Sequence, residues 1–255
     1  MNREQQWLLK EKYNGEKTKG FFADCERLAA GEPLGYVIGQ VPFLDCTIYL
    51  DSKPLIPRPE TEYWTEKAIY ELREAAEAAP QPLRVLDLCA GSGCIGVAVA
   101  HALPSAHVTF AEIDESHFIT INRNIEQNGV NLSNTRILAG NLFENITGPF
   151  DYILTNPPYI DPAVDRTESS VKNFEPHQAL YGGNDGLALI NQIIAEAPQH
   201  LTATGVLYIE HEPEQASAIQ ALGTTIGFSV TTHQDQYGVL RYSRLTRQNG
   251  DSMAQ

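Results

Sequence analysis

Residues 83–222 alternate between short apolar segments and segments with helical periodicity, and this alternation constrains the fold more than any other feature of the sequence. Apolar segments of strand length that are separated by helices are typical of a mainly parallel sheet with helices on both faces. The expected strands are residues 83–88, 107–113, 135–140, 150–156 and 205–211, and the expected helices are residues 93–103, 116–129, 187–201 and 214–222.

Two further strand-like segments follow, residues 228–234 and 238–245, and a short turn that begins at Asp235 separates them. Antiparallel neighbours can be joined by so short a connection, whereas parallel strands need a long crossover. We therefore expect an α/β fold with a Rossmann-like, mainly parallel seven-stranded sheet and an antiparallel edge. Residues 157–185 have no clear periodicity and are expected to be irregular.

The segment before the sheet is expected to form separate, smaller elements. Residues 36–50 are dense in β-branched and aromatic side chains and predict a hairpin or a bent pair of strands. A helix is expected from Glu60 or Thr61 to about Ala79, where prolines end it. The expected organisation is a short helical segment (1–32), a β-hairpin linker (33–56), the main domain (57–247) and a disordered polar tail (248–255).

The charge of the chain argues against several kinds of partner. A net charge of −14, from 32 acidic and 18 basic residues, disfavours a protein that grips nucleic acid by itself, because such proteins need a basic surface that displaces counterions. No apolar run approaches the ~20 residues that cross a bilayer, and the N-terminus lacks the apolar core of a secretory signal. We expect a cytoplasmic protein with no stable nucleic-acid partner and no membrane partner.

The four cysteines give no sign of a metal site. They are Cys25, Cys46, Cys89 and Cys94, and no pair has the C-x-x-C spacing of a zinc site or a redox dithiol. We expect four reduced thiols and no bound metal.

The first expected strand runs into a glycine-rich turn at Asp87-Leu88-Cys89-Ala90-Gly91-Ser92-Gly93. Ligands of open α/β sheets bind at the carboxyl ends of the strands, and glycines let the backbone approach a ligand and present amides at a helix N-terminus. The pattern Gly91-x-Gly93-x-x-Gly96 also satisfies the dinucleotide fingerprint, although as a bare pattern this signal is weak.

The polar residues near this turn favour S-adenosylmethionine over a dinucleotide. Asp87 would repel a pyrophosphate but attract the ammonium group of a methionine, directly or through water. Glu112, at the end of the second strand, can accept both ribose hydroxyl hydrogens of an adenosine, whereas Asp114 is more typical of a helix cap or a loop. After the third strand, Asn141 would lie beside the adenine, and Phe143 would cover the ring or enter the core.

The fourth strand ends in Asn156-Pro157-Pro158-Tyr159, which suits the methylation of a planar nitrogen. The lone pair of such a nitrogen is delocalised, and an enzyme helps by accepting both N–H hydrogens while the lone pair faces the methyl donor. The Asn156 side-chain oxygen and the Pro157 carbonyl are the expected acceptors, and the prolines fix them in advance. Tyr159 can pack against the planar group. The tetrapeptide alone does not distinguish a glutamine or asparagine amide from the exocyclic amine of adenine.

With these motifs in place, the chain resembles the PrmC/HemK family of class I S-adenosylmethionine-dependent methyltransferases, which modify a glutamine N5 in peptide chain release factors. The resemblance spans roughly residues 30–245 and rests on PLGYVIGQVPFLD, LIPRPETE, DLCAGSGCIGVAVA, NPPYI and FEPHQALYGGNDGL. LIPRPETE, placed ahead of the glycine-rich turn, separates this family from most DNA methyltransferases that carry NPPY.

The resemblance implies S-adenosylmethionine as the cofactor and the glutamine of a Gly-Gly-Gln loop in a class-1 release factor as the substrate. It also implies which residues form the site. From the residues alone, Arg58 would be a surface cation and Glu60 a charge at a helix N-terminus. The expected catalytic residues are Asn156, Pro157 and Tyr159. The expected substrate-binding residues are Arg58, Glu60, Thr61, Asn156, Pro157, Pro158, Tyr159 and Glu175. The expected cofactor-binding residues are Asp87, Leu88, Cys89, Ala90, Gly91, Gly93, Glu112, Ile113, Asn141, Leu142, Phe143 and Asn156.

Two departures from the family pattern stand out. Family members carry a longer helical N-terminal domain that helps to dock the release factor, so docking is expected to be reduced or the substrate to differ. Asn141 stands where an acidic residue is common, and its amide oxygen still offers an acceptor. His177 and His211 are expected to be structural rather than catalytic.

Other functions remain open at this point. A glutamine of a ribosomal protein is a close variant of the substrate, and an adenine N6 of DNA or RNA is a second class, disfavoured by the charge. A non-catalytic protein with the same fold would not be expected to keep Asn156, Pro157, Gly91 and Gly93 intact. A nicotinamide dehydrogenase is disfavoured by Asp87 and by the NPPY segment.

Overall fold

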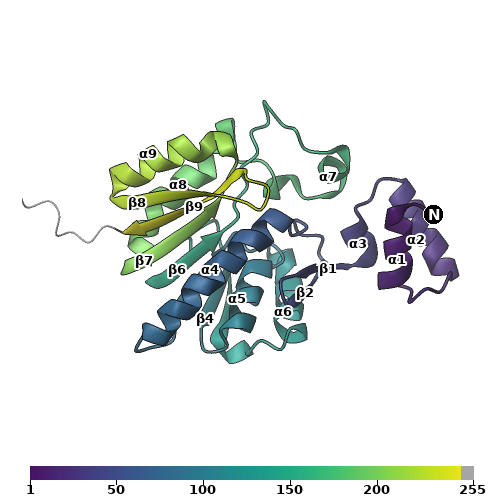
Figure 1. Cartoon of the computed structure of the whole chain (residues 1–255), viewed down its shortest axis with the longest axis horizontal. Helices are drawn as coiled ribbons and strands as arrows, with labels where there is room; N and C mark the ends of the chain where they lie inside the picture. Colours follow the sequence, from purple (N-terminus) through teal and green to yellow (C-terminus); the bar gives the residue numbers. More distant parts are fainter. Residues whose placement is uncertain (248–255) are drawn as a thin grey trace, which may run out of the picture.

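A seven-stranded sheet forms the centre of the molecule in the computed structural model, which describes residues 1–247 of the 255 (Figure 1). The strand order is β5-β4-β3-β6-β7-β9-β8. The strands are β3 (Arg84–Leu88), β4 (His107–Glu112), β5 (Thr135–Ala139), β6 (Phe150–Thr155), β7 (Leu201–Glu210), β8 (Phe228–Gln234) and β9 (Leu240–Arg247). The predicted α/β sheet is therefore confirmed, and the predicted tail at 248–255 lies outside the described residues.

One strand of the sheet, β9, runs antiparallel to its neighbours, and it is the second strand from the edge. β3 to β7 are parallel to one another, whereas β9 lies between β7 and β8 and is antiparallel to both. The chain adds β4 and β5 on one side of β3 and then crosses to β6 on its other side. This reversal between β3 and β6 is the position at which open α/β sheets bind ligands.

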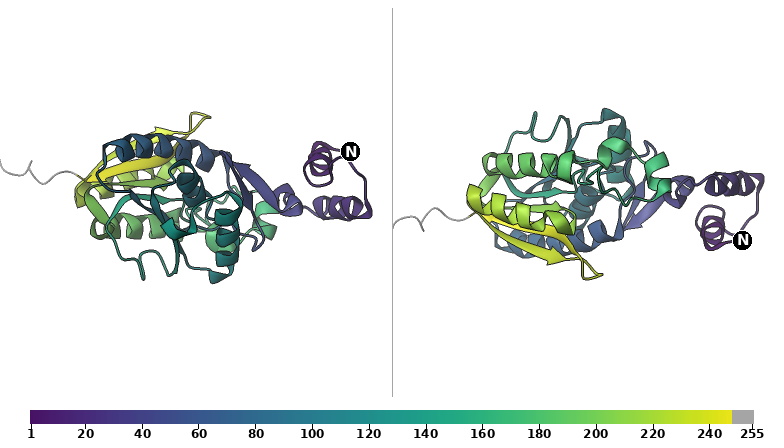
Figure 2. Two further views of the ribbon diagram at one scale, coloured as in Figure 1. Left: turned by 90° about the horizontal axis from the view of Figure 1, so that it is seen from below. Right: turned by 90° about the horizontal axis from the view of Figure 1, so that it is seen from above.

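Helices cover both faces of the sheet, as the figures show from three directions (Figures 1 and 2). Neighbouring strand residues point to opposite faces, so Val85 belongs to one buried cluster and Leu86 to the other. The first cluster is formed with α4 (Pro59–Ala78), α5 (Cys94–Ala102) and α6 (Phe118–Gln127), and the second with α8 (Ala188–His200) and α9 (Ala216–Ile226).

The N-terminal helices project from one end of the molecule (Figure 2). They are α1 (Arg3–Glu11), α2 (Lys19–Ala29) and α3 (Leu34–Ile38), and they bury Leu8, Phe21 and Val37 in a small core of their own. An antiparallel hairpin of β1 (Gln40–Phe43) and β2 (Cys46–Tyr49) connects them to the main domain. The predicted hairpin is therefore confirmed, but its predicted start is wrong because residues 34–38 are helical. Gly39 ends this helix at φ 96°, a conformation that favours glycine.

The segment between β6 and α8 is more ordered than the sequence predicts. It contains α7 (Ser169–Phe174) and the short 3₁₀ turns η3 (His177–Ala179) and η4 (Asn184–Gly186). α4 begins one residue earlier than predicted, at Pro59, because proline is well suited to the first position of a helix. Within residues 1–247, no helix has the length and apolar character needed to cross a membrane.

Candidate active site

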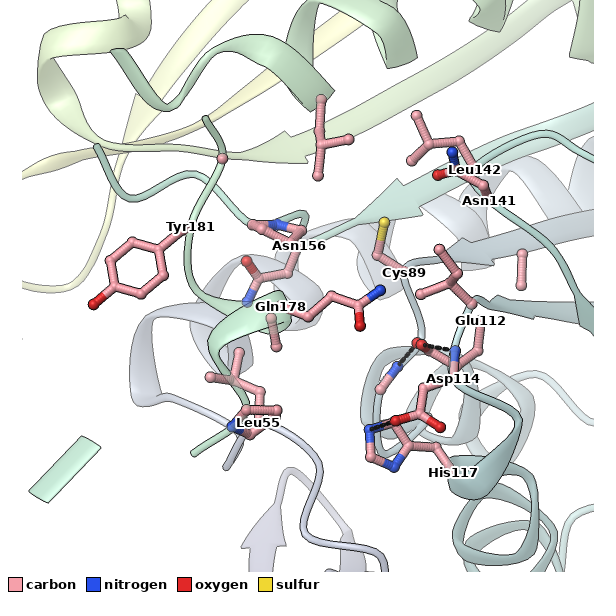
Figure 3. Close-up of a pocket in the computed structure, with 18 of the residues that line it drawn as sticks. Leu55, Cys89, Glu112, Asp114, His117, Asn141, Leu142, Asn156, Gln178 and Tyr181 are labelled. Carbon is pink, nitrogen blue, oxygen red and sulfur yellow. Dashed lines mark hydrogen bonds and ion pairs between the residues drawn. The ribbon is translucent and has the colours of Figure 1, made fainter. Parts of the chain in front are cut away.

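A cavity of about 410 Å³ lies at the carboxyl ends of β3, β4, β5 and β6 (Figure 3). Pockets for small ligands span roughly 300–1,000 Å³, so the cavity has room for a nucleoside-sized ligand. Its wall includes Cys89 and Gly91 after β3, Glu112 at the end of β4, Asn141 after β5 and Asn156 after β6. The structure therefore brings together the ends of all four strands that the sequence singled out.

Glu112 is the best-anchored of the predicted cofactor-binding residues. Its side chain is only 7% exposed, and its two carboxylate oxygens accept hydrogen bonds from the backbone N–H groups of Gly91 (2.7 Å) and Asp114 (2.9 Å). A carboxylate has about four acceptor positions, so Glu112 can still accept hydrogen bonds from a ligand. Asp114 lines the same cavity, but its carboxylate accepts a hydrogen bond from the Ser116 N–H at 2.9 Å as a helix cap.

Two residues without glycine's freedom adopt positive φ at the wall of the cavity. Cys89 has φ 61° and Leu142 has φ 51°, a conformation that L-residues rarely adopt. Backbone strain of this kind concentrates at functional sites. Gly91 also has a positive φ of 54°, but an added Cβ would meet nothing within 4 Å. Glycine is therefore favoured at position 91 by the backbone conformation and not by lack of space.

Gly96 and Asp87 form the support beneath the glycine-rich turn. A Cβ on Gly96 would lie 2.4 Å from the Phe110 ring, so only glycine fits there. The Gly96 N–H donates to one Asp87 carboxylate oxygen at 2.8 Å, and the other oxygen is buried without a partner among the described residues. Burial raises the pKa of Asp87 well above its ordinary value. Asp87 itself is not part of the cavity wall.

Several other predicted cofactor residues lie behind the wall rather than in it. Phe143 enters the core, where it is 5% exposed and its ring stacks on His200 with 4.4 Å between ring centres. Asn141 and Leu142 do line the cavity, as does Ile113. Leu88, Ala90 and Gly93 do not line it. These residues shape the turn, and a direct contact between them and a cofactor stays a prediction.

Asn156 lies where the first cavity meets a second one of about 450 Å³. The two cavities share Leu55, Asn156 and Ala179, whereas Pro157 and Tyr159 line only the second of the two. A methyl donor and a methyl acceptor that are held in two such cavities would meet beside Asn156. Reacting atoms held together in this way gain much of the rate advantage of an intramolecular reaction.

Two of the predicted substrate-binding residues, Arg58 and Glu175, connect the start of α4 to the segment that follows α7. The Glu175 carboxylate is buried and accepts hydrogen bonds from the Ile56 N–H (3.0 Å) and from Arg58 Nη2 (2.7 Å). Glu175 therefore holds the segment that precedes α4, although it lies more than 100 positions away in the sequence, and Arg58 reaches the wall of the second cavity. Glu60 lies in the first turn of α4 and lines neither cavity, in agreement with a charge at a helix N-terminus.

His211 is a buried structural residue beside the site, and it makes the stability of the fold sensitive to acid. Its Nδ1 must donate to the Glu212 carbonyl at 2.8 Å, so its Nε2 accepts from Ser243 at 2.9 Å in the neutral ring. Burial lowers the pKa of His211 from 6.5 to about 4. Between these values the unfolded chain binds the extra proton, so stability falls as the pH falls through this window.

We expect acidification from pH 7 to pH 5 to cost about 2 kcal/mol of folding free energy through His211, since each pKa unit corresponds to about 1.4 kcal/mol. Urea unfolding of the wild type and of His211→Gln at both pH values measures this contribution. The variant should lose less stability on acidification than the wild type. Equal losses in the two proteins would show that His211 does not carry the effect.

The structure also reveals site residues that the sequence does not indicate. Gln178 and Tyr181 reach the cavity from the segment after α7, and Leu55 and His117 reach it from the other side (Figure 3). Leu55, Gln178 and Tyr181 lie within the motifs LIPRPETE and FEPHQALYGGNDGL, but these motifs did not show which of their side chains line the cavity. The sequence analysis also missed Glu210. The signal that could have found it is an acidic residue at the carboxyl end of an apolar strand.

Comparison with known proteins identifies the family of this chain. Residues 72–175 match the family described as Methyltransferase small domain. A release factor glutamine methyltransferase of Lactococcus lactis is 34% identical over 236 residues, which cover 91% of this chain and 83% of the relative. A second relative with this name, from Deinococcus radiodurans, is 32% identical over 225 residues, which cover 88% of this chain and 78% of the relative.

A crystal structure of a methyltransferase from Pyrococcus furiosus has the same fold. It superposes with a TM-score of 0.56 at 20% identity, over 88% of this chain and 97% of the other. At this identity the likeness concerns the fold alone, whereas the two relatives above match most of both chains at more than 30% identity. The chain therefore belongs to the family of release factor glutamine methyltransferases.

Proposed function

We propose that this protein transfers a methyl group from S-adenosylmethionine to the side-chain N5 of the glutamine in the Gly-Gly-Gln motif of class-1 peptide chain release factors. The names of its relatives supply the substrate class. The observation that carries the proposal is the position of Asn156, a planar amide acceptor at the junction of a nucleoside-sized cavity and a second cavity.

The first cavity has the donors and acceptors that the cofactor needs. Glu112 would accept the ribose hydroxyl hydrogens, and Leu142 and Ile113 would pack against the adenine. The unpaired oxygen of Asp87 lies buried behind the glycine-rich turn, where the ammonium end of a bound ligand would favour the ionised carboxylate and offset the burial that raises the pKa of Asp87. When it is bound, S-adenosylmethionine supplies an electrophilic methyl group on a positively charged sulfur.

The second cavity would hold the glutamine amide. Asn156 Oδ1 and the Pro157 carbonyl accept the two N–H hydrogens and so fix the plane of the amide, which leaves the nitrogen lone pair facing the first cavity. The lone pair would form the new C–N bond while the methyl–sulfur bond breaks and its electron pair stays on the sulfur, and one N–H proton would then pass to solvent water. Acceptors that are fixed before the reaction need no reorganisation when charge develops on the nitrogen.

The experiment that tests this function is transfer of radiolabelled methyl from S-adenosylmethionine to a panel of substrates. The panel contains a class-1 release factor, the same factor with the Gly-Gly-Gln glutamine changed to alanine, ribosomal proteins and duplex DNA. We expect label on the release factor and none on its alanine variant. Label only on ribosomal protein or DNA, or equal label on both release factors, would overturn the proposal.

A further inference from the structure

A buried carboxylate at the end of β7 lies behind the NPPY segment. Glu210 is 1% exposed and accepts three hydrogen bonds: from Thr61 Oγ1 at 2.7 Å, from Trp64 Nε1 at 2.6 Å and from the Tyr159 hydroxyl at 2.9 Å. Burying a carboxylate is costly unless donors compensate it. A residue needed only for packing would be served at least as well by an apolar side chain of similar size.

The hydrogen-bond chain that starts at Glu210 determines how the Asn156 amide is turned. Thr61, Trp64 and Tyr159 all donate to Glu210, so the single Thr61 hydroxyl hydrogen is given to this carboxyl group. The Thr61 oxygen is then left as an acceptor, and Asn156 Nδ2 donates to it at 3.2 Å. With its NH₂ held by Thr61, Asn156 directs its Oδ1 the other way, and within residues 1–247 no group of the protein donates a hydrogen bond to that oxygen.

We propose that Glu210 and Thr61 are positioning residues for methyl transfer: Glu210 orients the Thr61 hydroxyl, and Thr61 holds the Asn156 amide with its oxygen toward the substrate. This inference rests on the proposed function, in which Asn156 Oδ1 accepts a hydrogen of the substrate amide. Glu210 also holds Tyr159 through its hydroxyl, so one carboxylate fixes two residues of the NPPY segment.

Exchanging the Thr61 hydroxyl for a methyl group tests the hydrogen-bond chain with little change in the shape of the side chain. Thr61→Val removes the acceptor for Asn156 and one donor to Glu210. We expect kcat to fall by up to about 100-fold, the cost of holding a reacting group in the wrong position, with the cofactor Kd unchanged. Thr61→Ser restores the hydroxyl and should recover most of this loss.

Thr65→Val is the matched control. Thr65 lies one turn further along α4, is equally buried, and its hydroxyl has no hydrogen-bond partner among the described residues. The control should therefore keep the wild-type kcat. A Thr61→Val enzyme with wild-type kcat, or equal losses in Thr61→Val and Thr61→Ser, would overturn the inference.

Glu210→Gln tests the other end of the hydrogen-bond chain. The NH₂ of the new glutamine can donate to Thr61 and so turn the Thr61 hydroxyl hydrogen toward Asn156. We expect a loss of kcat that is not additive with that of Thr61→Val, since both changes break the same chain. If the fold-losses of kcat in the two single variants multiply in the double variant, the two residues do not act through one hydrogen-bond chain.

An NMR measurement separates failure of this inference from failure of the proposed function. The Asn156 side-chain amide signals, assigned by their loss in Asn156→Ala, should shift in Thr61→Val and Glu210→Gln but stay near their positions in Thr61→Ser and Thr65→Val. This readout needs no substrate. Unshifted signals in Thr61→Val and Glu210→Gln overturn the inference even if the wild type methylates the release factor.

Discussion

Asn156→Ala is expected to lower kcat for release-factor methylation by about 10²–10³-fold, the effect of removing one preorganised hydrogen-bonding group that faces the reacting atoms. The cofactor Kd is expected to change little, because Glu112 and the glycine-rich turn remain intact. The loss should appear in kcat, since without Asn156 Oδ1 the substrate amide can rotate away from the methyl donor. Single-turnover methyl transfer and calorimetric titration with the cofactor measure the two quantities.

His177→Ala is the control for this variant. His177 is exposed in the segment between β6 and α8, and among residues 1–247 its Nε2 hydrogen-bonds only to the Lys172 carbonyl, at 2.8 Å. It should retain nearly all of the wild-type kcat. Wild-type kcat in Asn156→Ala would contradict the assigned role, and joint loss of turnover, cofactor binding and Tm would indicate a folding defect instead.

Glu112→Ala is expected to weaken cofactor binding by at least about 100-fold. Hydrogen bonds to a charged group contribute about 1.5–3 kcal/mol each, so the loss of two to the ribose amounts to about 3 kcal/mol or more. The variant also leaves the N–H groups of Gly91 and Asp114 without their acceptor, which loosens the turn. Calorimetric titration with S-adenosylmethionine and with its demethylated product measures the effect.

Asp114→Asn is the matched comparison for Glu112. Asp114 lines the same cavity two residues later, but its carboxylate is occupied in capping Ser116. It should bind the cofactor with an affinity within a few fold of the wild type. Equal losses of cofactor affinity in the two variants would contradict the assignment of the ribose contact to Glu112 alone. Unchanged affinity in Glu112→Ala would show that Glu112 makes no such contact.

Much of the site could be predicted because its chemistry is local in the sequence. The turn after β3, the acid at the end of β4 and the NPPY segment after β6 each follow a strand directly. Parallel strands bring their carboxyl ends to one edge, so the order of motifs along the chain was enough to place Gly91, Glu112 and Asn156 around one cavity. The helical start of the linker was mispredicted because the aromatic and β-branched residues at 36–38 are typical of a strand, whereas Gly39 and packing on Phe21 favour a helix.

The remaining parts of the site depend on contacts between segments far apart in the chain. Glu210 meets Thr61 across 149 positions, and Glu175 meets Arg58 across 117, so no local pattern could pair them. Phe143 and Asp87 are adjacent to motif residues, yet the structure places the first in the core and the second behind the turn. The direction of a side chain at a loop depends on backbone angles that the sequence did not reveal.

The sequence by itself determined the sheet, the family and the motif residues Gly91, Glu112 and Asn156 that line the cavity, because strand periodicity and short motifs encode them within a few positions. Only the tertiary structure decided how those residues are held. The two cavities share Asn156 because the strand order reverses between β3 and β6. The Asn156 amide is oriented because a buried carboxylate on β7 must satisfy its hydrogen bonds with donors from α4 and from the NPPY segment.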